Sequence, residues 1–331
     1  MKRILVTGIT GFAGPHLVNH LLTEKHAGEK VKVYGLVRAS NGRENDIRDI
    51  MDDDVFSRVT FLYGNLDDRQ SLKRIVAGVR FDEVYHLAAQ SHPPTSFTAP
   101  YSTFLTNTVG TVNLVDLLAT YRPECKMMNC STSEVYGAVV EERQPITELF
   151  PIAPVNPYGV SKAAADLYVT ERAHSTGQQL FNTRAFSHTG PRRGFRFSIS
   201  GDAYQITRIL KGLQKPVIQV GTLSSKRVVV DVRDTVRAYA ALMDWFIPGE
   251  SYNVGGNELN SMGGFLDEML DISGLTGMVE LEVNPAFVRP IDIPVQIPDS
   301  GKCKALTGWT PRIKIKHTLI DLLGYWDKKI E

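Results

Sequence analysis

The stretch VTGITGFAGPHLVNHLL, residues 6–22, decides the fold of this chain. It begins at the end of a short β-branched apolar run, passes through Gly8, Gly11 and Gly14, and continues with helical periodicity. Glycines in this position permit a tight turn, and they let backbone N–H groups approach a pyrophosphate at the N-terminus of the following helix. The stretch therefore predicts a strand–turn–helix unit that binds a dinucleotide.

Three glycines alone would be a weak indication, but the chain repeats the alternation of strand and helix. Buried strands are expected at residues 3–7, 31–37, 59–63, 83–88, 126–130 and 180–186. Amphipathic helices are expected at 14–25, 68–77, 102–120 and 158–175. This order predicts an α/β fold, a doubly wound parallel Rossmann sheet covered by helices on both faces, with ligands at the carboxyl ends of the strands.

After residue 186 the pattern becomes irregular and predicts a smaller α/β lobe. Helices are expected at 199–211, 259–272 and 316–329, and short strands at 217–220 and 279–283. The periodic segment 231–246 is expected to pack back on the first lobe. We therefore expect a cofactor-binding Rossmann domain over 1–186, with 231–255 returning to it, and an interleaved substrate lobe over 187–331.

Composition excludes several classes of protein. The 331 residues carry a net charge of +1, so no broad basic face for nucleic acid is predicted. The three cysteines show neither metal-ligand spacing nor a disulfide framework. No apolar run is long enough to span a membrane, and glycine interrupts the N-terminus too early for a signal peptide. We expect a cytoplasmic protein with no metal site.

The end of the second strand indicates which nicotinamide cofactor binds. NAD sites usually place a carboxylate there to hold the ribose hydroxyls. The stretch GLVRASNGR (35–43) instead offers Arg38 and Arg43, and arginine suits the 2′-phosphate of NADP. NADP is therefore favoured over NAD. Asn65 and Leu66, which follow the third strand, are expected beside the adenine.

The stretch YGVSK, residues 158–162, places Tyr158 and Lys162 four residues apart on one helical face. A free tyrosine has a pKa near 10, and lowering it to about 7 requires roughly 4 kcal/mol of preferential stabilisation of the phenolate. A neighbouring ammonium and a positively charged nicotinamide could supply it. The pair therefore predicts an acid–base centre that interconverts a hydroxyl and a carbonyl group.

Several motifs together resemble the extended short-chain dehydrogenase/reductases, in particular the branch that modifies nucleotide sugars. In family order they are TGITGFAG (7–14), HLAAQSH (86–92), NTVGTVNLV (107–115), STSEVYG (131–137), NPYGVSK (156–162), DVRDTVRAY (231–239) and TGWTPRI (307–313). Within the branch, the chain looks most similar to the GDP-mannose 4,6-dehydratases. The segments that carry this closer likeness are HLAAQSHPPTSF (86–97), STSEVYG, HTGPRRG (188–194) and VRP (288–290).

This resemblance implies a reaction and four catalytic residues. Such enzymes oxidise the sugar at C4, eliminate water across C5 and C6, and return hydride to C6, which leaves a 4-keto-6-deoxy sugar. Tyr158, assisted by Lys162, would take the C4 hydroxyl proton, and Thr132 would hydrogen-bond the C4 oxygen. Glu134 would remove the C5 proton and assist loss of the C6 hydroxyl. A simple 4-epimerase or reductase needs no base at C5, so Glu134 favours the dehydratase. The GDP-4-keto-6-deoxymannose reductases also carry a glutamate here, in Ser-Ser-Glu, so Thr132 in place of serine is the second residue that favours the dehydratase.

The resemblance also implies the residues that bind the two ligands. Those expected at the cofactor are Gly8, Thr10, Gly11, Phe12, Gly14, Arg38, Asn65, Leu66, Leu87, Ala88, Ala89, Ser91, Tyr158, Lys162, His188 and Arg193. Those expected at the GDP-sugar are Ser91, Thr132, Ser133, Arg227 and Arg289, where the arginines would bind the diphosphate.

Three departures from the dehydratase pattern keep alternatives open. Ser187 stands where many relatives carry asparagine, and Asp292 replaces a frequent glutamate. The segment 194–206, GFRFSISGDAYQI, looks closer to the NADPH-dependent GDP-4-keto-6-deoxymannose reductases. A reductase of that kind, or a dehydratase acting on another nucleotide sugar, is the second interpretation.

Relatives of this kind pair through the two helices that match 102–120 and 158–175, so a homodimer or homotetramer is expected. The loop from Arg38 to Arg48 resembles one that reaches a neighbouring subunit's cofactor in tetrameric dehydratases.

Overall fold

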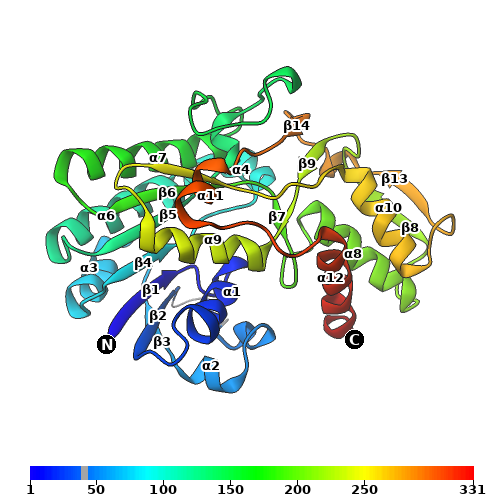
Figure 1. The fold of residues 1–331 in the computed structure, drawn as a ribbon. Coiled ribbons are helices and arrows are strands. Elements are labelled where there is room, and N and C mark those ends of the chain that lie inside the picture. The colour runs from blue at the N-terminus through cyan, green and yellow to red at the C-terminus, as the bar shows by residue number, and fades with distance from the viewer. Residues whose placement is uncertain (39–43) are drawn as a thin grey trace.

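The computed structural model describes residues 1–38 and 44–331, and its largest element is a seven-stranded parallel sheet with helices on both faces (Figure 1). The strands of the sheet are β1 (Lys2–Thr7), β2 (Val31–Val37), β3 (Val59–Tyr63), β4 (Glu83–His86), β5 (Lys126–Thr132), β6 (Leu180–Ala185) and β11 (Ser251–Val254). Their spatial order is β3-β2-β1-β4-β5-β6-β11, and every neighbouring pair is parallel. The predicted Rossmann architecture is confirmed. The strand order changes direction between β1 and β4, which is where such sheets bind ligands.

Helices cover both faces because the strands are apolar on both sides. The helical segments associated with this sheet are α1 (Ala13–His20), η1 (Leu21–Lys25), η2 (Glu44–Asp49), α2 (Asp53–Ser57), α3 (Arg69–Gly78), α4 (Pro93–Thr98), α5 (Pro100–Phe104), η3 (Leu105–Val109), α6 (Gly110–Tyr121), η4 (Ser133–Tyr136), η5 (Glu141–Arg143), α7 (Pro157–Thr176), α9 (Val232–Trp245) and α11 (Gly301–Thr307). Along β1, Ile4 and Val6 belong to the core under α1 and α9, whereas Leu5 belongs to the core under α3, α6 and α7. The alternation of side chains along each strand thus supplies both cores.

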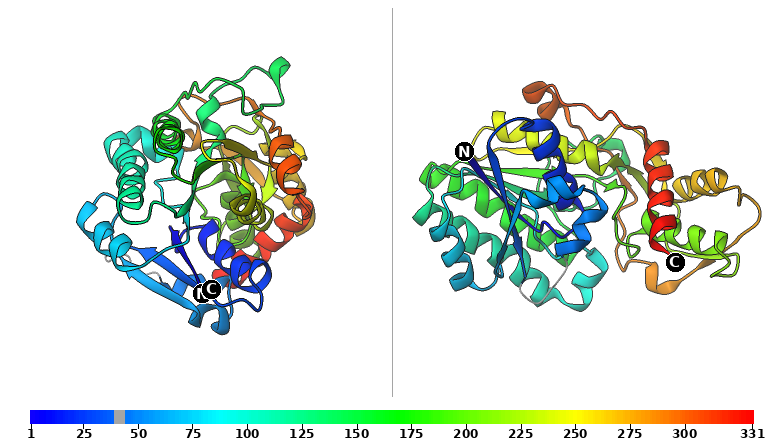
Figure 2. Two further views of the ribbon diagram at one scale, coloured as in Figure 1. Left: turned by 60° about the vertical axis from the view of Figure 1, so that its left-hand side comes forward. Right: turned by 90° about the horizontal axis from the view of Figure 1, so that it is seen from below.

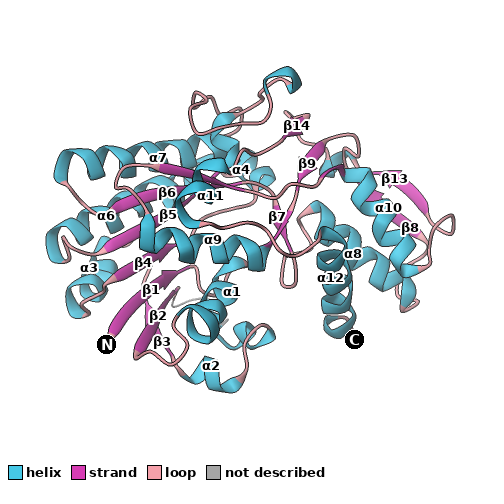
Figure 3. Cartoon of the chain, in the orientation of Figure 1, coloured by secondary structure: helices cyan, strands magenta, loops and turns pink. Residues whose placement is uncertain are grey.

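The second lobe stands beside one end of the sheet, as the view from below in Figure 2 shows. Its elements are β7 (His188–Thr189), α8 (Ser198–Leu210), β8 (Val217–Val220), β9 (Lys226–Val228), β10 (Val230–Asp231), β12 (Leu259–Ser261), α10 (Met262–Ser273), β13 (Glu280–Val283), η6 (Pro285–Phe287), β14 (Val295–Gln296) and α12 (Ile315–Lys329). Apolar residues of α8, α10, α12 and β8, among them Ile206, Ile218, Phe265 and Leu319, form its own core. Figure 3 shows β8 and β13 beside α10 at the outer side of this lobe.

The two parts of the chain are interleaved. Helix α9 packs against α1, and β11 extends the sheet beside β6, although both come from beyond residue 186. The domain division at residue 186 stays a prediction. Arg43, expected near the cofactor, lies outside the described residues.

One predicted helix differs from the structure at its start. Residues 259–261 form β12, which pairs antiparallel with β9, and α10 begins only at Met262. The Ser261 side chain accepts a hydrogen bond from the Gly264 N–H and caps the helix. Pairing with a distant strand therefore overrides the local helical pattern. Within 1–38 and 44–331, no helix combines the length and the apolarity needed to cross a membrane.

Candidate active site

A cavity of about 1280 Å³ opens at the carboxyl ends of β1 and β4 and continues to the second lobe. Apart from Arg43, every residue that the sequence predicted at the cofactor, the substrate or the catalytic centre lines this one cavity. The prediction named residues from the first 14 positions to Arg289, so the fold brings together groups that lie far apart in the sequence. The roles assigned to them stay predictions.

The glycine turn forms a cradle that has no room for side chains. Gly8 has a φ of +73°, and a Cβ on it would lie 2.8 Å from the backbone nitrogen of Ala88. A Cβ on Gly14 would lie 2.5 Å from the Gly8 carbonyl oxygen. Phe12 is the N-cap residue of α1, and its side chain accepts no hydrogen bond from the N–H groups of the first turn. Such an uncapped helix start beside a glycine turn fits a pyrophosphate.

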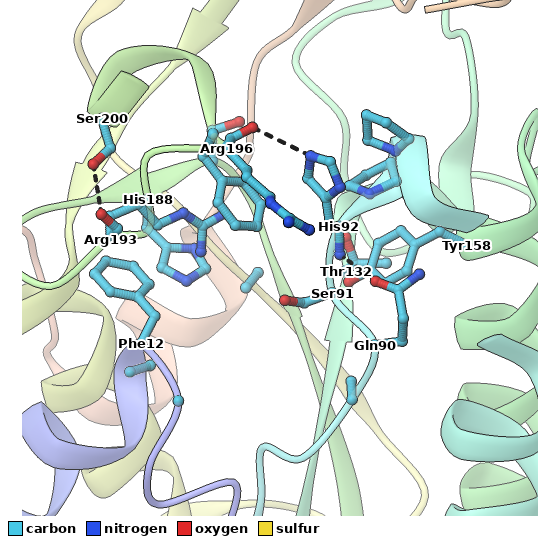
Figure 4. A pocket seen from close by; sticks show the side chains of 18 of the residues that line it. Phe12, Gln90, Ser91, His92, Thr132, Tyr158, His188, Arg193, Arg196 and Ser200 are labelled. Carbon is cyan, nitrogen blue, oxygen red and sulfur yellow. Dashed lines mark hydrogen bonds between the residues drawn. The ribbon is translucent and has the colours of Figure 1, made fainter. Parts of the chain in front are cut away.

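One wall of the cavity is built from Phe12, His188 and Arg193 (Figure 4). The rings of Phe12 and His188 stack with their centroids 5.7 Å apart, and the Arg193 guanidinium lies over the rings of Phe12 and Phe197 at 4.8 and 3.4 Å. Burial lowers the pKa of His188 to about 4, and the Arg193 charge lowers it as well, so the imidazole is neutral at pH 7. Burial lowers the pKa of Arg193 to about 10, which leaves it protonated. This wall thus presents one permanent positive charge.

Tyr158 and Lys162 lie in the first turns of α7, which Asn156 caps by accepting a hydrogen bond of 2.7 Å from the Gly159 N–H. Burial raises the pKa of Tyr158 above its ordinary value, while a hydrogen bond with the Thr132 side chain and the Arg193 charge lower it. Burial lowers the pKa of Lys162, and no described residue hydrogen-bonds its ammonium. The ammonium lines the cavity and can therefore serve a bound ligand. Stabilisation of the phenolate in the loaded site, as the sequence suggested, stays a prediction.

Glu134 follows β5 and is held by residues from two other segments. Asn156 donates a hydrogen bond of 2.7 Å to Glu134 Oε2, and Arg289 lies 3.4 Å from Glu134 Oε1. The Thr132 hydroxyl accepts a hydrogen bond of 3.3 Å from the Glu134 N–H, which fixes these two residues relative to each other. A carboxylate, a threonine hydroxyl and the Tyr158 phenol therefore meet at one end of the cavity.

Ser133 and Arg227, two further residues predicted at the substrate, also have protein partners. The Ser133 hydroxyl donates a hydrogen bond of 3.0 Å to Gln296, which in turn donates to the Ser133 carbonyl at 3.2 Å. Arg227 lies 3.4 Å from Asp292, and burial lowers its pKa. Ser133 is thus fastened to β14, while Arg227 and Arg289 form a cationic pair along the cavity wall.

Sequence reasoning missed Arg192, which supports the glycine turn from outside. Its guanidinium donates hydrogen bonds to the carbonyl oxygens of Gly11 and Thr10 at 3.1 and 3.0 Å, and it forms an ion pair of 3.2 Å with Asp49. Arg192 has a φ of +74°, which is rare for a residue with a side chain. Because its partners lie far away in the sequence, no local pattern could have indicated this role.

Asn156, Gln296 and Asp202 were also missed. The Asn-Pro pair that starts α7 predicts a capping asparagine, but not its contact with Glu134. Asp202 lines the second-lobe side of the cavity.

The family model described as GDP-mannose 4,6 dehydratase matches residues 5–322. The chain belongs to the GDP-mannose 4,6-dehydratase family. Among members, GDP-mannose 4,6 dehydratase 1 of Arabidopsis thaliana is 30% identical over 331 residues, which cover 97% of this chain and 89% of the relative. The dehydratase sdnI of Sordaria araneosa is 29% identical over 97% of this chain, but the chain covers only 60% of that longer protein.

This dehydratase family shares its fold with reductases. The GDP-6-deoxy-D-mannose reductase of Pseudomonas aeruginosa is 32% identical over 251 residues, which cover 75% of this chain and 81% of the relative. The solved structure of RMD from Pseudomonas aeruginosa complexed with NADPH has a TM-score of 0.84 and 27% identity, with full coverage of both chains.

Proposed function

We propose that this member of the GDP-mannose 4,6-dehydratase family converts a GDP-hexose, GDP-mannose in the first place, to the GDP-4-keto-6-deoxy sugar. The observation that carries this proposal is the meeting of Glu134 with Thr132 and Tyr158 at one end of the cavity. An alcohol-oxidising pair alone would serve a reductase or an epimerase. A carboxylate beside it supplies the base that elimination requires.

The residues divide the reaction between them. Tyr158 takes the proton of the C4 hydroxyl, and the Thr132 hydroxyl orients the same oxygen. The C4 ketone acidifies the C5 proton, which Glu134 removes and then delivers to the departing C6 hydroxyl, so that water leaves. Once hydride has returned to C6, C5 takes up a proton from solvent, and Tyr158 releases to solvent the proton that it took from the C4 hydroxyl. Asn156 holds the Glu134 carboxylate in place for both transfers, and Arg289 holds its other oxygen only until substrate binds.

The cofactor we propose is NADP rather than NAD. NADP supplies the acceptor for hydride from C4 and the donor of hydride to C6, so it is regenerated in each turnover. Arg38 lines the cavity just after β2, where the 2′-phosphate would lie, and the related RMD was solved with NADPH. The uncapped N-terminus of α1 fits the pyrophosphate, and Lys162 offers its ammonium to ribose hydroxyls.

The GDP-sugar lies on the other side of the cavity in this proposal. Arg227 and Arg289 bind the diphosphate, and each exchanges its present carboxylate partner for phosphate oxygens. This exchange would release Glu134 Oε1 from Arg289 when substrate arrives. The compartment we propose is the cytoplasm.

A second candidate is an NADPH-consuming GDP-4-keto-6-deoxymannose reductase. The likeness to the Pseudomonas aeruginosa reductase in sequence and in structure favours it. A reductase would consume one NADPH for each sugar and would have no use for Glu134 as a base.

Incubation of the purified protein with GDP-mannose and a trace of NADP tests the proposal, with the Tyr158→Phe variant as the inactive control. We expect keto-sugar to accumulate far beyond the amount of cofactor, and the variant to lose activity about 10²- to 10⁴-fold. Absence of product from GDP-mannose, together with NADPH-dependent reduction of GDP-4-keto-6-deoxymannose, would establish the reductase instead.

We also propose a homodimer or homotetramer. Apolar side chains of Phe104, Val160 and Leu167 are exposed on α5 and α7, the region through which relatives were expected to pair. A monomer would leave this apolar surface in water.

A further inference from the structure

Asp202 is a buried carboxylate that the proposed reaction does not use. It lies in the first turns of α8, is only 5% exposed, and lines the cavity. It makes no hydrogen bond or ion pair with any residue in 1–38 or 44–331. Burial alone raises its pKa to about 7. A buried carboxylate without a partner is costly, so its presence beside a cavity indicates a ligand that supplies hydrogen-bond donors.

Gln205, one turn after Asp202 on α8, joins this helix to β8 by hydrogen bonds. Gln205 donates a hydrogen bond of 3.0 Å to the Gln219 carbonyl and accepts one of 2.8 Å from the Gln219 N–H. Residues three apart share one face of a helix, so Asp202 lies on the face of α8 that meets β8. The side chain of Gln205 is thereby occupied, and Asp202 is left facing the cavity.

An aromatic ring from the second lobe also lines the cavity. Gly221, just after β8, approaches Phe287 so closely that a Cβ on it would lie 2.8 Å from the Phe287 carbonyl oxygen. Phe287 is 54% exposed, and Gly221 and Phe287 both line the cavity. The second lobe thus offers an aromatic face and an unpaired carboxylate, which together suit a flat heterocycle with N–H donors.

The order of the other groups indicates which part of a nucleotide sugar reaches Asp202. The sugar lies at Glu134 and Tyr158, and the diphosphate lies at Arg289 and Arg227 in the proposed function. No arginine contributes to the pKa of Asp202, so this carboxylate lies apart from the diphosphate-binding charges. A carboxylate would also repel phosphate. The base is therefore the part of the ligand that meets Asp202.

We propose that Asp202 selects guanine as the base of the nucleotide sugar, an inference that rests on the proposed function. Its two carboxylate oxygens accept hydrogen bonds from the N1–H and the 2-amino group of guanine, two donors that lie side by side. Uracil and thymine offer one N–H between two carbonyl groups, and adenine offers an amino group beside an acceptor nitrogen. The carboxylate therefore binds two donors of guanine, whereas each of the other bases would place a hydrogen-bond acceptor against one carboxylate oxygen.

Calorimetric titration of the NADP-loaded protein with GDP, IDP and XDP tests this assignment. Inosine lacks the 2-amino group, so we expect the wild type to bind IDP about 10- to 100-fold more weakly than GDP. In Asp202→Asn the amide carbonyl still accepts N1–H, but the amide N–H₂ faces the 2-amino group of guanine. We expect this variant to bind XDP more tightly than GDP, because xanthine carries a carbonyl oxygen at that position.

Asp271→Asn, an exposed change on α10, serves as the matched control and should keep the order of the wild type. Equal affinity of the wild type for GDP and IDP, a result that needs no variant, would overturn the assignment. An unchanged preference for GDP in folded Asp202→Asn would overturn it too. Selective binding of GDP without turnover of GDP-mannose would support Asp202 while rejecting the proposed reaction, so the two failures are distinguishable.

Discussion

At the scale of single residues, our proposal depends on the Glu134 carboxylate, which would suit a reductase-like centre to elimination. Asn156 and Arg289 each bind one of its oxygens, and Thr132 binds its backbone N–H. A residue held by three partners is fixed in position before substrate arrives. Asn156 and Arg289 lie 22 and 155 positions away from Glu134, so the order of residues along the chain does not reveal these two contacts.

We expect Glu134→Gln to block elimination and leave C4 oxidation intact, because the amide cannot accept the C5 proton. Incubation with GDP-mannose in D₂O should show no deuterium at C5 and a loss of product of about 10²- to 10⁴-fold. Reduction of bound NADP, followed by absorbance, should persist for a single turnover. Deuterium exchange at C5 at the rate of the wild type would exclude Glu134 as the base.

Asp202 gives a second prediction at this scale, on stability. Its pKa of about 7 in the folded protein exceeds its ordinary value of 3.8, so folding favours the protonated form. The stability it contributes is therefore full below pH 3.8 and is lost as the pH rises through 7. The difference of about three pKa units corresponds to an upper bound on the order of 4 kcal/mol.

We therefore expect Asp202→Asn to raise the melting temperature of the ligand-free protein at pH 8 and to change it little at pH 4. Thermal unfolding at the two pH values, with Asp271→Asn as control, measures the effect. An equal shift at both pH values would show that the carboxylate is not ionised at a cost in the folded protein.

The sequence predicted the residues that line the cavity better than the residues that support them. Gly8, Gly14, Tyr158 and Lys162 were predicted because the roles expected of them depend on residue type and short spacing. Arg192 reaches Thr10 and Gly11 across more than 180 positions, and such a contact leaves no local pattern. Resemblance to the family indicated Arg227 and Arg289, but not the carboxylates with which they pair here.

At the scale of elements, the glycine turn between β1 and α1 requires the backbone at Gly14 to lie close to the backbone at Gly8. The turn was predicted from the sequence because closely spaced glycines between a buried strand and an amphipathic helix are typical of it.

Strands β7, β9, β10 and β14 were not predicted, since each has only two or three residues. Periodicity needs more residues than that, and these strands exist because distant segments pair with them.

We expect Gly14→Ala to disrupt this turn, because its Cβ would lie 2.5 Å from the Gly8 carbonyl oxygen. Each hydrogen bond lost to a cofactor phosphate should weaken binding by about 10- to 100-fold, as titration with NADP would measure. Gly324→Ala is the matched control, because nothing lies within 4 Å of its Cβ in the interior of α12. That change should stabilise the protein by up to about 1 kcal/mol and leave NADP affinity unchanged. Normal NADP affinity in Gly14→Ala would contradict the cradle.

At the scale of the whole molecule, the cavity lies between a sheet that holds the cofactor in our proposal and a lobe that holds the nucleotide sugar. The Rossmann part was predicted almost strand by strand, because its alternating pattern is long and regular. The second lobe was predicted only in outline, since it depends on pairings such as β9 with β12 and β14.

The exposed apolar face on α5 and α7 leads to a prediction about assembly. Leu167 on α7 is 53% exposed, and a charge there should oppose the pairing of two copies. We expect Leu167→Glu to shift the protein from dimer or tetramer to a smaller species in sedimentation equilibrium. Leu210→Glu is the control, because Leu210 at the end of α8 is equally exposed, at 55%, on another part of the molecule. An unchanged mass for Leu167→Glu would place the interface elsewhere.

The most direct measurement follows a deuterium atom that starts on C4 of GDP-mannose, with NADP present in trace amounts. If Tyr158 and Glu134 act in one site as proposed, the label should be found at C6 of the 4-keto-6-deoxy product, in many equivalents per cofactor. Product without the label at C6, or no product from GDP-mannose at all, would contradict the account.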